Sequence, residues 1–115
     1  MACVAQFGIV EIFEEDKDYS DYEPEKYNCV AIDDDYLNEW WEELTLLQTY
    51  SHSYSRPEFA LARWGVTLIP PASLAAFYDI VAKDHRARTS QELLDLMTLL
   101  RQAISENKYV IHYGV

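Results

Sequence analysis

Basic residues and glycines are scarce in this 115-residue chain, and each shortage argues against a class of function. Nine Lys and Arg side chains stand against twenty Asp and Glu, which gives a formal net charge of −11. Affinity for phosphate backbones comes largely from Lys and Arg, so this balance disfavours nucleic acid as a direct ligand and also an anionic membrane surface. The three glycines, Gly8, Gly65 and Gly114, form no Gly-rich phosphate-binding loop.

Long hydrophobic segments are also missing. No apolar run approaches the roughly 20 residues that a helix needs to span a bilayer. The first ten residues have neither the basic region nor the cleavage-site pattern of a signal peptide. We therefore expect a cytoplasmic protein in which Cys3 and Cys29 are reduced thiols within apolar segments. A disulfide between them is the alternative, and it depends on the strand register.

Patterns that mark catalytic sites do not occur. No pair among His52, His85 and His112 has the i, i+4 spacing of a helical zinc site, and neither cysteine joins a histidine in a compact motif. The serines lie outside any nucleophile-elbow pattern. We therefore predict that the chain is not an enzyme and binds no cofactor.

One segment begins like a calcium-binding loop. Asp16, Asp18 and Ser20 alternate as the first ligands of such a loop do. Asp21 then stands where the loop requires Gly, and Tyr27 stands where it requires a bidentate Glu. We predict no metal site here.

Half of the residues are apolar or aromatic, which is enough to build one core, and we expect a single domain over residues 1–115. The periodicity predicts strands at 4–13, 27–32, 66–69 and 109–113, with Gly8 as a possible bulge. Helices are predicted to begin near residues 33–35, 56, 71 and 89. The order β-β-α-α-β-α-α-β favours an α+β fold, a small mixed or antiparallel sheet of about four strands with about four helices packed on it.

Local signals at the helix ends support these boundaries. Ser55 and Glu58 are spaced as a capping box for the helix at 56–64, with Gly65 as its stop and Trp64 in the core. Residues 89–92 form a second capping box before the clearest amphipathic pattern in the chain. Pro71 suits the first turn of the helix that it begins.

The acidic side chains are concentrated in one third of the chain. Residues 11–44 contain fourteen of the twenty Asp and Glu and only two basic residues, a formal charge of −12. This segment divides into an acidic loop, residues 14–26, and a helix that follows Asp33. Acids near a helix N-terminus are favoured by its dipole, so the helix acids have a structural role. The acids of the acidic loop have none, unless they are simply a solvated surface.

Lys83, His85, Arg86 and Arg88 form the only basic cluster. They could complement the end of a helix dipole, pair with the acidic loop or bind a small anion.

Clustered acids interleaved with Tyr and Trp are typical of a surface that binds a basic protein, because aromatic side chains supply large rigid contact areas. We therefore predict a binding protein that neutralises or regulates a basic protein partner. The predicted contact residues are Glu14, Glu15, Asp16, Asp18, Tyr19, Asp21, Tyr22, Glu23, Glu39, Trp40 and Glu43.

In size, acidity, α+β composition and lack of catalytic motifs, the chain resembles bacterial immunity proteins. The resemblance is one of overall character and transfers no functional residue. It implies that the partner is a toxin, of a basic nuclease type, or that the acids imitate nucleic-acid phosphates. The alternatives are a small homo-oligomeric domain of metabolic role, whose aromatics form a self-association patch, and a small enzyme whose site assembles only in the fold.

Overall fold

Two strands rich in β-branched and aromatic residues, β1 (Val4–Val10) and β6 (Tyr109–Gly114), pair at the centre of the sheet. The computed structural model of the chain describes residues 4–62 and 64–114. Its sheet has six strands in the order β2-β1-β6-β5-β3-β4, and every neighbouring pair is antiparallel. The other strands are β2 (Val30–Asp33), β3 (Gln48–Ser51), β4 (Pro57–Phe59) and β5 (Gly65–Ile69).

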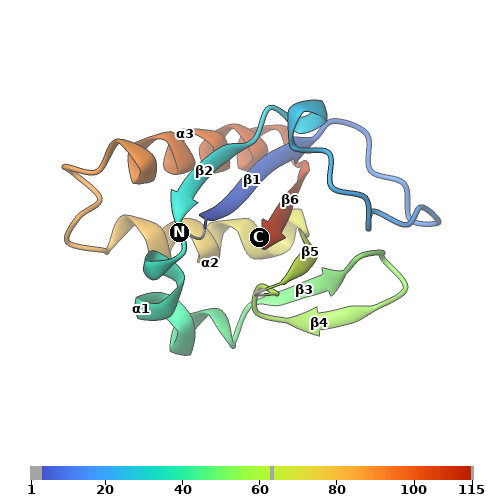
Figure 1. The fold of residues 1–115 in the computed structure, drawn as a ribbon, viewed down its shortest axis with the longest axis horizontal. Helices are drawn as coiled ribbons and strands as arrows, with labels where there is room; N and C mark the ends of the chain where they lie inside the picture. The colour runs from blue at the N-terminus through green and yellow to red at the C-terminus, as the bar shows by residue number, and fades with distance from the viewer. Residues whose placement is uncertain (1–3, 63, 115) are drawn as a thin grey trace.

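The helices α1 (Asp35–Leu44), α2 (Pro71–Ala82) and α3 (Gln91–Glu106) supply the main core. Figure 1 shows α2 and α3 behind the sheet, with α1 beside them below β2. Their buried side chains meet alternate residues of the strands, such as Ala5 and Phe7 of β1 and Val110 of β6. The α+β class and the antiparallel sheet are confirmed, although the sheet has six strands and the described part of the chain has three α-helices.

The longest helix follows its sequence pattern closely. The apolar stripe Leu93, Leu96, Leu100 and Ala103 of α3 is fully buried. Asn107 ends the helix in the left-handed conformation with φ 56°. None of the described helices combines the length and the apolar character that crossing a bilayer requires.

The N-terminus of α3 differs from the predicted capping box by one residue. Ser90, rather than Thr89, is the N-cap, and its hydroxyl accepts a hydrogen bond from Leu93 N at 3.3 Å. Glu92 does not reach back to the cap. Its carboxylate instead accepts from Asp33 N at 2.7 Å and so ties α3 to the end of β2.

The predicted helix at 56–64 is wrong. Residues 57–59 form the edge strand β4, and β3 replaces the expected end of the preceding helix. Pro57 has no backbone N–H to donate and is tolerated at a sheet edge. Ser55 Oγ bonds Ser53 Oγ instead of capping a helix. Gly65, with φ 109°, begins β5, and Trp64 is 74% exposed rather than in the core.

Gly8 is not a bulge, since β1 pairs with β6 without interruption, but the position still requires glycine. A Cβ at Gly8 would lie 2.6 Å from Tyr27 Cβ and 2.8 Å from Cys29 Sγ. Cys29 is a free, partly buried thiol, and burial raises its pKa to about 11. Cys3 lies outside the described residues.

We expect Gly8→Ala to destabilise the protein by about 1–3 kcal/mol, because the segment that carries Tyr27 and Cys29 must move off the sheet. Urea denaturation monitored by circular dichroism measures the change. Ala31→Ser, at an exposed position of the adjacent strand β2, is the control and should shift the free energy of unfolding by less than about 0.5 kcal/mol. An equal, small effect of both substitutions would contradict the close approach.

Candidate functional site

The acidic loop is anchored on the sheet face opposite the helices, and Tyr19 is its main anchor. The Tyr19 side chain is only 4% exposed and packs in the second apolar cluster with Val10. Its ring stacks on Phe13 at 5.4 Å, and its hydroxyl accepts a hydrogen bond from Glu14 N at 2.9 Å. Tyr19 N donates to His52 O at 2.7 Å, which ties the loop to the turn between β3 and β4. Figure 1 shows the loop and this turn at the same end of the sheet.

A second anchor holds the later part of the loop. The Tyr22 hydroxyl donates to Gln6 Oε1, and the Tyr22 ring meets the edge of Tyr113 at 5.1 Å. The chain then forms the short 3₁₀ helix η1 (Pro24–Tyr27). The ring of its last residue, Tyr27, lies 6.5 Å from the ring of Tyr113. The loop backbone is therefore held against β1 and β6 by aromatic contacts.

Most carboxylates of the acidic loop are exposed and form no ion pair with a described residue. Glu23 pairs with Lys26 at 3.7 Å, and Lys17 lies 5.0 Å from the centre of the Tyr19 ring. Ser20 donates to Asp18 from its backbone N–H at 2.9 Å, and hydrogen bonding to Ser20 holds the pKa of Asp18 below its usual value. The exposed carboxylates that form no ion pair with any described residue are Glu14, Glu15, Asp16, Asp18, Asp21 and Glu25.

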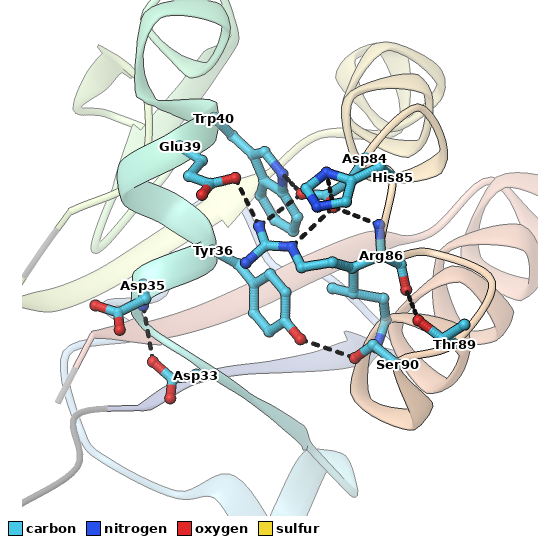
Figure 2. Close-up of polar contacts among 11 residues, drawn as sticks. Asp33, Asp35, Tyr36, Glu39, Trp40, Asp84, His85, Arg86, Thr89 and Ser90 are labelled. Carbon is cyan, nitrogen blue, oxygen red and sulfur yellow. Dashed lines mark hydrogen bonds and ion pairs between the residues drawn. The ribbon is translucent and has the colours of Figure 1, made fainter.

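The acids of α1 have a different environment, because Lys83 and Arg86 of the predicted basic cluster pair with them and not with the acidic loop. Arg86 Nη2 lies 2.8 Å from Glu39 Oε2, and Lys83 pairs with Glu43. Figure 2 shows the Arg86 side chain directed toward α1 from the turn between α2 and α3. The guanidinium carbon also lies 4.3 Å from the centre of the Tyr36 ring, a cation–π geometry.

Asp84 is the buried centre of this contact. Its side chain is 3% exposed and accepts from Arg86 Nη2 and from Trp40 Nε1, each at 2.8 Å. Hydrogen bonds from Arg86 hold the pKa of the Asp84 carboxyl far below its usual value, and Asp84 in turn raises the pKa of Arg86. The hydroxyl of Tyr36 on α1 and that of Ser90, the N-cap of α3, share a hydrogen bond of 2.9 Å. The network joins α1 to the start of α3.

The predicted contact residues thus separate into three groups. Tyr19 and Trp40 are each 4% exposed and hold the fold together. Glu39 and Glu43 lie on α1 and are paired with basic side chains. Tyr22 is 55% exposed and lies on the acidic loop. The remaining predicted residues share this loop, namely Glu14, Glu15, Asp16, Asp18, Asp21 and Glu23.

A ring cluster next to the acidic loop was not predicted from sequence. Phe13 stacks on Tyr109 at 3.6 Å and meets the edge of Tyr54 at 6.2 Å, while Tyr54 lies 4.8 Å from Tyr50. We call Phe13, Tyr50, Tyr54 and Tyr109 the aromatic cluster. Burial, followed by the neighbouring Tyr50 and Tyr54 and then by the charge of Glu15, raises the pKa of Tyr109 to about 12. The close spacing of Tyr50 and Tyr54 was the sequence signal that could have indicated this cluster.

The three histidines occupy separate environments. His85 is exposed and lies 3.8 Å from Asp84, whereas His52 belongs to the turn between β3 and β4. His112 is fully buried 4.9 Å from Phe7, and no described residue forms a hydrogen bond with either of its ring nitrogens. Within residues 4–62 and 64–114, no three His, Cys, Asp or Glu side chains are grouped as a metal site would require.

His112 gives the protein a specific sensitivity to acid. Burial lowers the pKa of His112 to about 3, while an unfolded histidine titrates near 6.5. The unfolded state therefore binds more protons between these values, and stability is lost as the pH falls from about 6.5 toward 3. We expect a loss of about 2–3 kcal/mol at pH 4.5 relative to pH 7 from this residue. Urea denaturation of the wild type and of His112→Leu at both pH values isolates it, and a difference that stays constant with pH would refute it.

The fold and this surface define an α+β domain with an anchored acidic loop. Comparison of the chain with protein-family models, with curated protein sequences and with solved structures found no match.

Proposed function

We propose that this chain is an acidic binding protein that neutralises or regulates a basic protein partner, with the acidic loop as its contact surface. The observation that supports this most is the group of exposed carboxylates, from Glu14 to Asp21, that form no ion pair with a described basic side chain. Such a surface attracts a cationic partner and speeds encounter. Because Tyr19 already holds the backbone, binding loses little further conformational entropy.

Within this surface, Tyr22 provides an exposed ring among the carboxylates, as binding hot spots often do. Glu39 and Glu43 lie outside its centre, because Arg86 and Lys83 already neutralise them. Tyr19 and Trp40 act indirectly by holding the loop and α1 in place.

A narrower form of the proposal is that the chain is a cytoplasmic immunity protein and the partner a bacterial toxin. The partner, expressed alone in the source cell, should then arrest growth. Co-expression of the wild-type chain should restore growth, and co-expression of a chain with Glu14, Glu15, Asp16 and Asp18 changed to Lys should not. A partner without toxicity would reject this narrower form and leave the binding proposal intact.

The binding proposal is tested by isolating the partner. The immobilised chain is exposed to extract of the source cell at low salt, and retained proteins are eluted in salt steps and identified. A basic protein should elute at moderate salt, and after purification it should rebind in isothermal titration calorimetry with an affinity that falls as salt rises. Failure of every retained basic protein to rebind in purified form would contradict the proposal.

A self-associating domain is the second candidate, supported by exposed apolar side chains away from the acidic loop. Leu46 is 82% exposed, Trp64 74% and Phe59 60%. Equilibrium sedimentation at high protein concentration separates the two candidates. A monomer removes the self-association candidate, while a dimer that Leu46→Glu or Phe59→Glu dissociates supports it.

A further inference from the structure

We propose that an arginine side chain of the basic partner binds in the groove beside Tyr109, against the aromatic cluster and the carboxylate of Glu15. This inference rests on the proposed function and assigns one position of the contact surface to one chemical group. A planar guanidinium can stack on an aromatic ring while it donates hydrogen bonds to a carboxylate.

The groove is formed where the acidic loop leaves β1. It has a volume of about 330 Å³, and its lining includes Phe13, Glu15 and Tyr109. The two rings that line the groove, Phe13 and Tyr109, stack at 3.6 Å, and Tyr54 of the same cluster meets Phe13 at 6.2 Å. Phe13 and Tyr109 are only partly buried, and Tyr54 is 37% exposed.

The charges around the groove leave Glu15 available to a cation. Lys108 also lines the groove, but it pairs with Glu11 and with Glu106, the latter at 2.8 Å. Glu15 forms no ion pair with a described residue. Glu15 lines the same groove as Tyr109, and its charge adds to the raised pKa of Tyr109 after the larger effects of burial, Tyr50 and Tyr54.

Elsewhere the chain already uses tyrosine rings to hold its own cations. Lys17, Lys26, Arg86 and Arg101 lie over the rings of Tyr19, Tyr27, Tyr36 and Tyr78, at 4.3–5.9 Å from their centres. Among the described residues, no cation lies over Tyr50, Tyr54 or Tyr109. The three tyrosine rings of the aromatic cluster therefore have no described cation over them, and Glu15 beside Tyr109 has no described ion-pair partner.

The test uses the full chain with labelled tyrosine rings and a tripeptide, N-acetyl-Gly-Arg-Gly-amide, titrated at low salt and followed by nuclear magnetic resonance. The matched peptide carries citrulline, which has the shape of arginine without its charge. We expect saturable shifts of the Tyr54 and Tyr109 ring signals with the arginine peptide only. Glu15→Gln should weaken binding about threefold, whereas Glu25→Gln, which removes an exposed charge of the same loop outside the groove lining, should not.

Each result of this titration is decisive. Equal weakening by Glu15→Gln and Glu25→Gln, or shifts centred on Tyr22, would overturn the arginine site while the acidic loop remained a contact surface. Equal binding of the citrulline peptide, or no saturable binding, would also overturn it. The proposed function is judged separately, by rebinding of the purified partner.

Discussion

Asp84→Ala is expected to destabilise the protein by about 3 kcal/mol. The substitution removes the acceptor for Trp40 Nε1 and for the Arg86 guanidinium, and the Asp84 side chain is only 3% exposed. The buried Trp40 N–H is left without an acceptor, and Arg86 keeps only the exposed carboxylate of Glu39 as its partner. Urea denaturation followed by tryptophan fluorescence measures the change, because Trp40 itself reports the loss of the contact.

Two variants control for this prediction. Asp84→Asn keeps an acceptor oxygen but no charge and should lose less stability than Asp84→Ala. Asp79→Ala removes an exposed acid of α2 and should change the free energy of unfolding by less than about 0.5 kcal/mol. Because the pKa of Asp84 is lowered in the folded state, its stabilisation is present above the unfolded value of 3.8 and is lost as the pH falls below it. Equal stabilities of the wild type and Asp84→Ala would contradict the network's role.

Reversal of four charges in the acidic loop is expected to weaken partner binding roughly 100-fold. The variant changes Glu14, Glu15, Asp16 and Asp18 to Lys, and its net charge becomes −11 + 8 = −3. Each lost attraction contributes about 0.5–1 kcal/mol at a solvent-exposed interface, and the new like charges add repulsion. Titration calorimetry with the purified partner gives the two dissociation constants.

A matched variant separates position from total charge. Four exposed acids outside the loop are changed to Lys, and the net charge is again −3; they are Glu42, Glu58, Asp79 and Asp95. This variant should bind the partner within about threefold of the wild type at physiological salt, where distant charges are screened. Equal weakening in both variants would show that only total charge matters.

Local sequence signals predicted the elements whose pattern is long and consistent. The stripe of α3, the proline at the start of α2 and the apolar strands β1 and β6 each agree with their tertiary environment. The same reasoning failed at residues 48–59, where Ser55 and Glu58 have the spacing of a helix cap. There the pairing of β3 with β5 competes with the local signal, and this pairing joins residues as distant as Tyr50 and Leu68.

The candidate site shows the same limit. The concentration of acids could be located from sequence, and so could its division into a loop and a helix. Tyr19 is held by a backbone hydrogen bond to the distant His52, and Glu39 pairs with Arg86, 47 positions away. The aromatic cluster likewise joins Phe13, Tyr54 and Tyr109 from three separate segments. Spacing along the chain contains no information on such contacts.

Zero-length crosslinking of the complex tests the central claim most directly. A carbodiimide joins a carboxylate to a lysine amine only where the two are in contact, and peptide mass spectrometry then locates each junction. We expect crosslinks from the purified partner's lysines to Glu14, Glu15, Asp16, Asp18 or Asp21. Junctions confined to acids outside the loop, such as Glu42, Glu58 or Asp79, would contradict it.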